Sequence, residues 1–306
     1  MNWLAKAAAY RILSALPGGA ALYRYSQERI TKSLVPTSER VGQKIDVGLK
    51  YLDWLTNHGL RERLIAGVHL DFGAGWHPTI PLLYYCLGVN RQHLFDVTAN
   101  LDGQMVGQTI KIFLAIVTDS QWPHRAKLGR LPAPLEDADW REYLGRLGVS
   151  YHAPYADAFP ALVGGVDVVT STQVLLYVPR SVMPGCLSQV HASLRPGGVF
   201  LASVYLRDIL AGNPHTSADK YNHLRYSPES WERWFNSSIM SFNRFKAPDY
   251  REMLERAGFE VVHFEVDPAT AADYAELDRI RVHRCFQHYT REDLAARGLF
   301  FVARKR

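Results

Sequence analysis

The chain has 306 residues, of which 47% are hydrophobic and 21% are charged. This length and composition are enough to bury the core of one large α/β domain with additions. Its three cysteines lie far apart and form no Cys-x-x-Cys pair, which argues against a disulfide framework or a zinc site and favours a reducing cytoplasm. No apolar run approaches the roughly 20 residues that cross a bilayer.

The formal net charge of the chain is +5. Its basic residues are interspersed along the sequence, apart from the closing run Arg304 to Arg306, and no nucleic-acid recognition motif is present. We therefore expect a cytoplasmic protein without a bound metal and without a nucleic-acid partner.

Residues 1–60 are predicted to form a helical N-terminal extension. Met1 to Leu16 is rich in alanine and stops at Pro17, and Thr37 can cap a second helix. The apolar residues of that second helix recur at helical spacing: Val41, Ile45, Leu49, Leu52 and Leu55. We expect the first helix to pack on the domain, to pack on a second copy in a homo-oligomer, or to lie weakly on a membrane surface.

Residues 68–81 are predicted to form a strand, a tight loop and the start of a helix. The apolar run ends at Asp71, Gly73 and Gly75 follow, and Pro78 opens a second apolar stretch. Glycine permits a positive φ and a close approach of a ligand to the main chain, and proline is tolerated in the first turn of a helix. We expect the loop to offer free backbone donors at the carboxyl end of the strand, where open α/β sheets bind their ligands.

The residues around this loop favour a cationic ligand over a dinucleotide. A dinucleotide fingerprint needs a third glycine, but Trp76, His77 and Pro78 follow Gly75. The carboxylate of Asp71 would repel a diphosphate, whereas it suits a cation. The segment resembles motif I of class I S-adenosylmethionine-dependent methyltransferases, in the small-molecule, methyltransferase type 11-like bacterial branch. It departs from that motif at His77, where the family most often has another glycine.

The resemblance implies S-adenosylmethionine as cofactor and predicts its site. Asp96 closes a predicted strand about 20 residues after the glycines, the distance at which a carboxylate reaches ribose hydroxyls, and the family assigns it the same role. After a strand at 149–152, Asp157 and Ala158 resemble the third motif, which contacts the adenine through the acid and through a backbone donor. The predicted cofactor-binding residues are Asp71, Gly73, Ala74, Gly75, Asp96, Asp157, Ala158 and Ser171.

The later segments predict the rest of the fold. Residues 194–198, Leu-Arg-Pro-Gly-Gly, are expected to turn into an apolar strand, as is common in the same family. Strands at 259–266 and 298–304 resemble the antiparallel pair that closes its sheet. We therefore expect a Rossmann-like, doubly wound α/β sheet of seven strands with an antiparallel closing strand. The catalytic domain would span 61–306, with lid insertions at 97–148 and 207–247.

A base would be needed to remove a proton from an alcohol acceptor. Many small-molecule methyltransferases that the chain resembles carry a Glu-His pair after the fourth strand, but Leu176 and Tyr177 stand there in this chain. The candidate catalytic residues are therefore Tyr177, His215 and His223. Asp219 is the expected partner that orients a histidine.

The leading hypothesis is methyl transfer from S-adenosylmethionine to a small-molecule, glycan-linked or lipid-linked acceptor, with oxygen as the preferred acceptor atom. A non-catalytic methyltransferase-like subunit remains open, because the Glu-His pair is replaced. A nicotinamide-dependent oxidoreductase is a third hypothesis, which Asp71, the missing third glycine and the closing strand pair disfavour.

Overall fold

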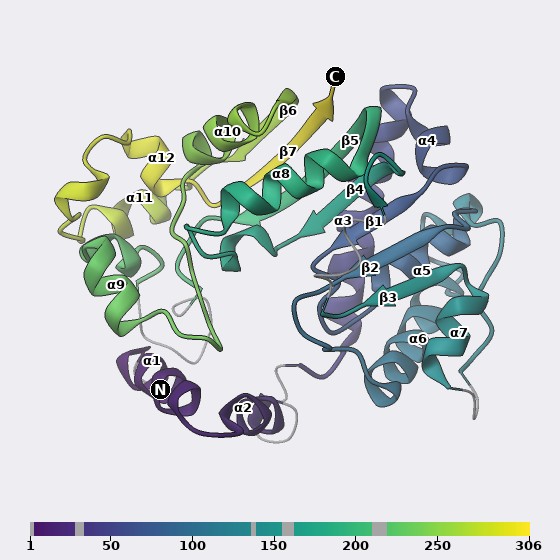
Figure 1. Ribbon diagram of the computed structural model, residues 1–306, viewed down its shortest axis with the longest axis horizontal. Helices are drawn as coiled ribbons and strands as arrows, with labels where there is room; N and C mark the ends of the chain where they lie inside the picture. Colours follow the sequence, from purple (N-terminus) through teal and green to yellow (C-terminus); the bar gives the residue numbers. More distant parts are fainter. Residues whose placement is uncertain (1–2, 28–33, 136–138, 155–161, 210–218) are drawn as a thin grey trace. The chain divides into compact units, whose positions relative to one another are not determined.

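The computed structural model describes residues 3–27, 34–135, 139–154, 162–209 and 219–306 (Figure 1). The chain divides into two compact units. The β1 unit, named after its first strand, contains residues 34–172, 189–201 and 303–306. The α1 unit, named after its first helix, contains residues 1–33, 173–188 and 202–302.

The β1 unit is built from parallel strands and helices. Leu70 on β1 lies opposite His93 on β2 and Val169 on β4, and Leu94 on β2 lies opposite Tyr151 on β3, all in parallel pairing. Its elements are α3 (Ser38–Asn57), α4 (Arg61–Ile65), β1 (His69–Phe72), α5 (Thr79–Cys86), β2 (Gln92–Phe95), α6 (Gly103–Val117), the 3-10 helix η2 (Arg125–Lys127), α7 (Trp140–Arg146), β3 (Val149–His152) and β4 (Val166–Thr172).

The α1 unit contains most of the helices that follow the fourth strand. Its elements are α1 (Trp3–Ala15), α2 (Gly19–Tyr25), η4 (Leu175–Tyr177), η5 (Asn222–Arg225), α9 (Pro228–Trp234), α10 (Ala247–Arg256), β6 (Phe259–Asp267), α11 (Ala271–Leu277), η6 (Arg284–Phe286) and α12 (Arg291–Ala295). Three elements contribute residues to both units: α8 (Met183–Ser193), β5 (Leu194–Tyr205) and β7 (Gly298–Lys305).

The strands form one seven-stranded sheet in the order β3-β2-β1-β4-β5-β7-β6. At the end of β7, Lys305 Nζ donates to the carbonyl oxygen of Leu194 at the start of β5, at 2.8 Å. Just beyond the end of β5, the N–H of Leu206 donates to the carbonyl oxygen of Arg297, just before β7, at 3.2 Å. The two strands therefore run antiparallel, and the predicted sheet with its antiparallel closing strand is confirmed.

Local predictions agree with the structure except at three places. The cap of α3 is confirmed, because Thr37 Oγ1 accepts from the N–H of Arg40 at 3.3 Å. The predicted turn before the fifth strand is wrong, since β5 begins at Leu194 and includes the Pro-Gly-Gly sequence. The apolar stretch Ile110 to Val117 predicts a helix, and that helix begins earlier in the structure, at Gly103, because Asp102 caps it. A second short helix, α2, follows the break at Pro17.

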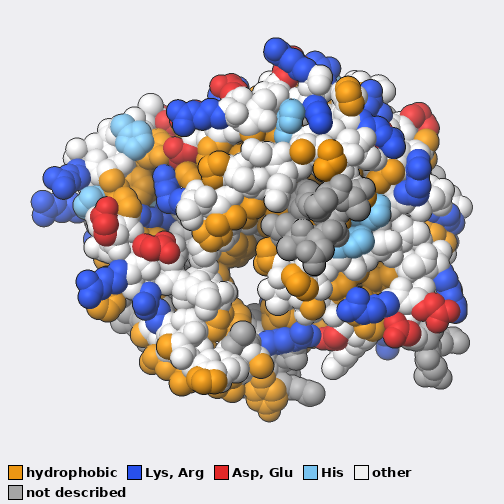
Figure 2. Space-filling model, in the orientation of Figure 1, with side chains coloured by type: hydrophobic (Ala, Val, Ile, Leu, Met, Phe, Trp, Pro, Cys, Tyr) orange, Lys and Arg blue, Asp and Glu red, His pale blue; other side chains and the backbone are white. Residues whose placement is uncertain are grey.

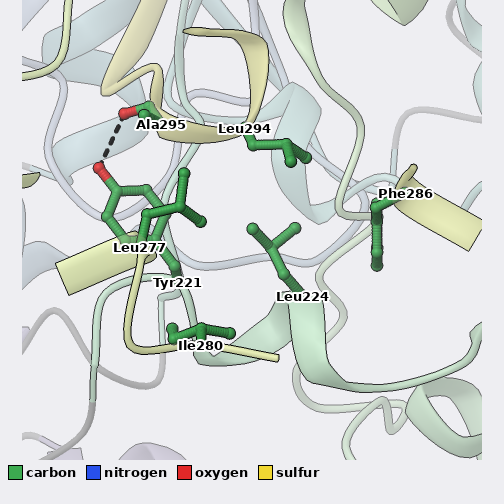
Figure 3. Packing of buried hydrophobic residues seen from close by; sticks show 7 residues of the cluster. All are labelled: Tyr221, Leu224, Leu277, Ile280, Phe286, Leu294 and Ala295. Carbon is green, nitrogen blue, oxygen red and sulfur yellow. Dashed lines mark hydrogen bonds between the residues drawn. The ribbon is translucent and has the colours of Figure 1, made fainter. Parts of the chain in front are cut away.

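A hydrophobic cluster forms the core of the α1 unit around its last helices (Figure 3). Its members are Tyr221, Leu224, Leu277, Ile280, Phe286, Leu294 and Ala295. Tyr221 also donates its hydroxyl hydrogen to the carbonyl oxygen of Ala295 at 2.7 Å. Since Tyr221 and Leu224 come from the predicted 207–247 insertion, this part of the insertion is packed interior.

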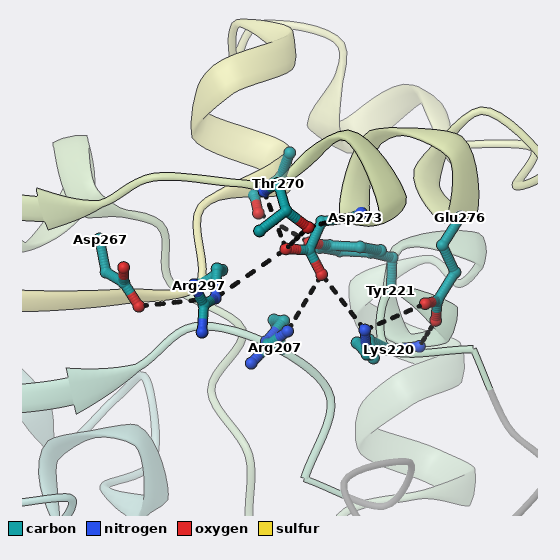
Figure 4. A network of polar contacts seen from close by, with 9 residues as sticks. Arg207, Lys220, Tyr221, Asp267, Thr270, Asp273, Glu276 and Arg297 are labelled. Atoms are coloured by element: carbon teal, nitrogen blue, oxygen red, sulfur yellow. Dashed lines mark hydrogen bonds and ion pairs between the residues drawn. The ribbon is translucent and has the colours of Figure 1, made fainter.

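A polar network around Asp273 lies beside that cluster (Figure 4). Asp273, on α11, is 2% exposed and accepts from Arg207 Nη1 at 3.1 Å and Lys220 Nζ at 3.2 Å. The N–H and the hydroxyl of Thr270 donate to its other oxygen at 2.9 and 2.8 Å. Burial alone would raise the pKa of Asp273, but the Thr270 hydrogen bonds and the charge of Lys220 outweigh it and lower the pKa to about 2.

The surface agrees with the charge pattern of the sequence. On the face drawn in Figure 2, Lys and Arg side chains are spread out rather than collected in one region. Across the described ranges, every helix is too short or too polar to cross a membrane. Within the same ranges, we find no group of three or more His, Cys, Asp or Glu side chains arranged to hold a metal ion.

Candidate cofactor site and candidate bases

The glycine loop joins β1 to α5 and is held against the end of β2. Gly73 and Gly75 have φ values of 84° and 67°, in the left-handed region that favours glycine. The N–H groups of Gly73 and Ala74 both donate to the carbonyl oxygen of Phe95, at 2.8 and 3.0 Å, and the N–H of Gly75 donates to Asp96 Oδ2 at 2.8 Å. The prediction that the loop offers free backbone donors is therefore wrong for these three residues. Their N–H groups fix the loop itself.

Among the residues that the structure describes, none closes the outer side of the loop. A Cβ added to Gly75 would have the carbonyl oxygen of Gly73 as its nearest neighbour, 3.9 Å away. Asp96 is buried beside the loop, and its Oδ1 accepts from the N–H of Thr98 at 3.2 Å. Because each carboxylate oxygen has two lone pairs, Asp96 can hold the loop and still accept hydrogen bonds from ligand hydroxyls.

Asp71 lies in the buried strand β1, two residues before Gly73, and is 6% exposed. Its Oδ1 lies 2.9 Å from Thr170 Oγ1 on β4. Burial raises the pKa of Asp71 to about 6, against the opposing effects of the Thr170 hydrogen bond and the positive charge of Lys44, and Asp96 raises it further. A buried carboxylate with a raised pKa is one that would gain from a cation bound beside it.

Lys44, on α3, is a site residue that sequence reasoning missed. Its Nζ donates to the carbonyl oxygen of His77 at 3.2 Å, and its charge acts on both Asp71 and Asp96. Burial lowers the pKa of Lys44, whereas the two carboxylates raise it. The available signal was a lysine three residues after Val41, on the buried side of a helix where apolar residues are expected.

His77, which departs from the family motif, is part of the loop's packing. It is 8% exposed, and its Nδ1 lies 3.3 Å from Thr109 Oγ1 on α6. Burial and then the charges of Lys44 and Arg40 lower its pKa to about 3. His77 is therefore neutral at physiological pH, and it fills the space that a glycine would leave empty.

Ser171 connects the end of β4 to its neighbours. Its hydroxyl donates to the carbonyl oxygen of Phe72 on β1 at 2.9 Å, and its own carbonyl oxygen accepts from the Tyr51 hydroxyl at 3.1 Å. Tyr51, which comes from α3, was also missed by sequence reasoning. Asp157 and Ala158, the predicted adenine contacts, lie outside the described residues.

His223, one of the candidate bases, is buried inside the α1 unit. It is 0% exposed, and its Nε2 lies 3.2 Å from Lys246 Nζ. Burial and then the charges of Lys246 and Arg244 hold its pKa well below the ordinary value for histidine. Among the described residues, this packing encloses His223, and its role as a general base stays a prediction.

Lys246 is a buried cation that lies beside His223. Its Nζ donates to the carbonyl oxygens of Leu206 at 3.1 Å and Leu294 at 3.4 Å, which join the end of β5 to α12. Burial lowers its pKa to about 7, although Asp249 acts in the opposite direction. The lysine, with its carbonyl acceptors, is an interior packing group of the α1 unit.

Of the other two candidate bases, Tyr177 lies within the described residues and His215 does not. Tyr177, on η4, is 42% exposed, and burial and then the neighbouring Tyr23 raise the pKa of its phenol. Asp219 accepts from Arg225 Nη2 at 3.1 Å, in an ion pair at the surface.

Comparison with known proteins identifies the family. A family model described as a methyltransferase domain matches residues 59–264. Demethylspheroidene O-methyltransferase of Rhodobacter capsulatus is 35% identical over 101 residues, which make up 32% of this chain and 22% of that protein. The match thus spans about a fifth of the length of that relative.

Several solved structures are similar at low identity. A methyltransferase from Mesorhizobium loti is 17% identical, with 80% of this chain and 97% of that chain covered and a TM-score of 0.38. One from Methanosarcina mazei is 13% identical, with 78% and 91% covered and a TM-score of 0.42. The 1,6-didemethyltoxoflavin-N1-methyltransferase of Burkholderia thailandensis is 17% identical, with 78% and 70% covered and a TM-score of 0.40.

The residues of the site fit the cofactor of that family. S-adenosylmethionine carries an ammonium and a sulfonium, and Asp71 is a buried carboxylate suited to a cation. Its ribose carries hydroxyls, and Asp96 retains acceptor capacity beside the open side of Gly75. Taken with the family match and the strand order, the chain belongs to the methyltransferase domain family and is a class I S-adenosylmethionine-dependent methyltransferase.

Proposed function

We propose that this chain transfers a methyl group to a hydroxyl oxygen of a small-molecule, glycan-linked or lipid-linked acceptor. The observation that carries the proposal is the buried carboxylate of Asp71 beside the open side of the glycine loop, a setting that suits a cationic methyl donor. The choice of oxygen is supported by the curated relative, which is named as an O-methyltransferase.

The residues of the β1 unit divide the binding of the donor among them. Asp71 supplies a negative charge for the ammonium of its methionine part, which S-adenosylhomocysteine retains, and Asp96 accepts from ribose hydroxyls. Lys44, whose charge acts on Asp71 and Asp96 in the free protein, pairs with the carboxylate of the methionine part. When bound, S-adenosylmethionine supplies an electrophilic methyl group on a positively charged sulfur. Asp157, Ala158 and Ser171 stay in the proposed site as predicted from the family.

The chain contributes to the reaction mainly by alignment of donor and acceptor and by exclusion of water. A proton must also leave the acceptor hydroxyl. Tyr177, which is 42% exposed, and His215 are the proposed proton acceptors. Replacement of either by Phe or Asn, respectively, tests this role through the pH profile of turnover, while donor binding stays unchanged.

Calorimetry with S-adenosylhomocysteine tests the donor site. Gly75→Val places a side chain in the open space and should weaken binding at least 100-fold. Gly59→Val is the matched control, because Gly59 has a similar φ of 69° and no atom near its added Cβ, but lies at the end of α3. Equal affinities in both variants would refute this site. Binding of a nicotinamide cofactor in place of S-adenosylhomocysteine would support the oxidoreductase alternative.

The acceptor atom is tested with donor carrying a carbon-13 methyl group, incubated with hydroxylated small molecules, glycans and lipid extracts. The carbon chemical shift of the product distinguishes methyl on oxygen from methyl on nitrogen or carbon. A methyl group on nitrogen or carbon would overturn the proposal of O-methylation. Donor binding without transfer to any acceptor class would favour the non-catalytic subunit.

We further propose that the hairpin of α1 and α2 rests on an anionic membrane surface, close to a lipid-linked acceptor. Ile12, Leu16, Leu22 and Tyr25 are 49–62% exposed, and hydrophobic side chains gather over these helices at the lower edge of Figure 2. Residues 1–27 contain basic side chains and no Asp or Glu. Apolar side chains combined with positive charge are typical of helices that lie at a membrane interface.

Sedimentation with vesicles tests this contact. Vesicles of phosphatidylcholine and phosphatidylglycerol should bind the wild type, and the double variant Ile12→Glu/Leu22→Glu should lose that binding. Val163→Glu/Val266→Glu is the matched control, because it makes the same charge change at exposed valines elsewhere. A dimer that the first variant converts to monomers, without vesicle binding, would instead make the hairpin the interface of a homo-oligomer.

A further inference from the structure

A chain of buried polar groups leads from the start of α5 to Asp71. Gln92 Nε2 lies 3.0 Å from the carbonyl oxygen of Pro81, and Gln92 Oε1 lies 3.1 Å from His69 Nδ1. His69 Nε2 lies 2.8 Å from Thr170 Oγ1, which in turn lies 2.9 Å from Asp71 Oδ1. The four side chains are 0–6% exposed, so each must find its hydrogen-bond partners within this chain of contacts.

The carbonyl oxygen of Pro81, at one end of this series of polar groups, sets the direction of every hydrogen bond in the series. The carbonyl oxygen of Pro81 can only accept, so the amide NH2 of Gln92 faces it and Gln92 Oε1 faces His69. Because Oε1 can only accept, His69 must carry its hydrogen on Nδ1. Burial lowers the pKa of His69 to about 3, so the ring is neutral and its Nε2 is an acceptor.

The direction of the hydrogen bond between Thr170 and Asp71 follows from the tautomer of His69. Since His69 Nε2 accepts, the one hydroxyl hydrogen of Thr170 points to it. Thr170 Oγ1 then has only lone pairs to offer toward Asp71, so the Thr170 hydrogen bond that would lower the pKa of this carboxyl group is not made in the free enzyme. An ionised carboxylate would place its own lone pairs against them at 2.9 Å, whereas a protonated carboxyl group donates to Thr170 and completes the chain.

We propose that Gln92, His69 and Thr170 are positioning residues that hold Asp71 protonated in the cofactor-free enzyme at mildly acidic pH, so that binding of the cationic donor releases this proton there. Asp71 ionises as the cation arrives, and the Thr170 hydroxyl turns to donate to it. The proton leaves to solvent. This inference rests on the proposed donor site, because it needs the cation to bind beside Asp71.

Other charged groups around Asp71 act on the same equilibrium. Lys44 from α3 favours the ionised form, whereas Asp96 after β2 opposes it. The phenol of Tyr84 on α5 has a raised pKa and stays neutral. Lys44 can itself exchange a proton when the donor binds, so the contribution of Asp71 must be isolated with Asp71→Asn.

Calorimetry of S-adenosylhomocysteine binding in buffers of different ionisation enthalpy counts the protons released. At pH 5, where Asp71 is protonated in the free enzyme, the wild type should release about one proton more than Asp71→Asn. The Kd of the wild type should fall about tenfold per pH unit in this range and level off above it. Equal proton counts in the two proteins would overturn the proposal, while the binding itself would leave the donor site intact.

Variants of Gln92 and Thr170 distinguish a positioning role from a packing role. Gln92→Met has nearly the same shape but no amide, so His69 can move its hydrogen to Nε2 and Thr170 can donate to an ionised Asp71. It should release fewer protons and show a flatter pH profile. Thr170→Ser keeps the hydroxyl and should retain the wild-type proton count. A Gln92→Met protein that releases as many protons as the wild type would refute the relay.

Infrared difference spectra of the wild type provide a measurement that does not depend on the stability of a variant. The carbonyl band of a protonated carboxyl group should disappear when S-adenosylhomocysteine binds. Asp71→Asn should lack this band. If S-adenosylhomocysteine binds and no such band is lost, the inference fails while the proposed function stands; if it does not bind, the proposed function fails as well.

Discussion

Two buried aspartates, one in each unit, have pKa values that are shifted in opposite directions. Asp71 in the β1 unit is 6% exposed and has a pKa raised to about 6, whereas Asp273 in the α1 unit is 2% exposed and has a pKa lowered to about 2. The difference is in their partners. Asp273 has three cations and two Thr270 hydrogen bonds, but Asp71 has one hydroxyl and an indirect charge from Lys44.

The two pKa shifts distinguish a carboxylate that stabilises the fold from one that is suited to bind a cationic ligand. A fully paired buried carboxylate stabilises the structure that pairs it, and its removal leaves buried cations without a partner. A poorly paired one costs stability in the free protein, and this cost is recovered when a cation binds. Asp273 is therefore expected to matter for folding and Asp71 for binding.

The largest expected effect is on the structural side of this contrast. Asp273→Ala should lower the free energy of unfolding by about 3–5 kcal/mol, because Arg207 and Lys220 lose a buried partner. Denaturant unfolding measures this change. Asp278→Ala is the control, since Asp278 pairs with Arg291 at the surface and should change stability by less than about 1 kcal/mol. Similar losses in both variants would contradict the assignment.

The same carboxylate should contribute to acid unfolding. Its folded pKa of about 2 lies below the ordinary value of 3.8. The stabilisation is therefore fully present above pH 4 and is lost as the pH falls from about 4 to 2. The difference in stability between the wild type and Asp273→Ala should shrink over this window, and a difference independent of pH would contradict the assigned pKa.

A smaller effect of opposite sign is expected at Asp71. Its folded pKa of about 6 lies above 3.8, so the folded state binds more protons than the unfolded state between these values and loses stability as the pH rises through them. Asp71→Asn should therefore stabilise the cofactor-free protein at pH 8, by on the order of 2 kcal/mol, while it weakens S-adenosylhomocysteine binding. Thermal unfolding and calorimetry give the two readouts. Loss of both stability and binding would place Asp71 with Asp273 as a structural residue.

The smallest effect tests which part of the donor Lys44 meets. Lys44→Met should raise the Kd of S-adenosylhomocysteine about tenfold, close to 1.4 kcal/mol. It should leave the Kd of methylthioadenosine unchanged, because that ligand lacks the amino-acid carboxylate. Lys50→Met, on the exposed side of α3, is the control. Weaker binding of both ligands to Lys44→Met would mean that the lysine acts by holding the loop through His77.

The fold was largely predictable because its signals are local. A buried strand followed by Gly73 and Gly75, an N-cap at Thr37 and apolar strands in the expected order each depend on neighbouring residues, and the structure confirms them. The beginning of β5 was not predictable in this way. Its Pro-Gly-Gly sequence predicts a turn, but the strand begins before it, at Leu194.

The candidate site could be predicted only in part, because burial and pairing are decided by distant residues. Asp71 and Asp96 could be found from their places at strand ends. Lys44 could not be assigned, because its partners lie about 30 or more residues away on other elements. His223 was a reasonable candidate from its chemistry, but the interior packing of the α1 unit encloses it.

The sequence by itself determined the order of strands and helices, the glycine loop and the acids at the ends of the first two strands, since each follows from local conformational preference and hydrophobic pattern. Only the tertiary structure decided the protonation of Asp71 and the use of the loop's N–H groups. The physical reason is that hydrogen-bond partners and desolvation are set by contacts between segments far apart in the chain, such as Gln92, His69 and Thr170 around Asp71.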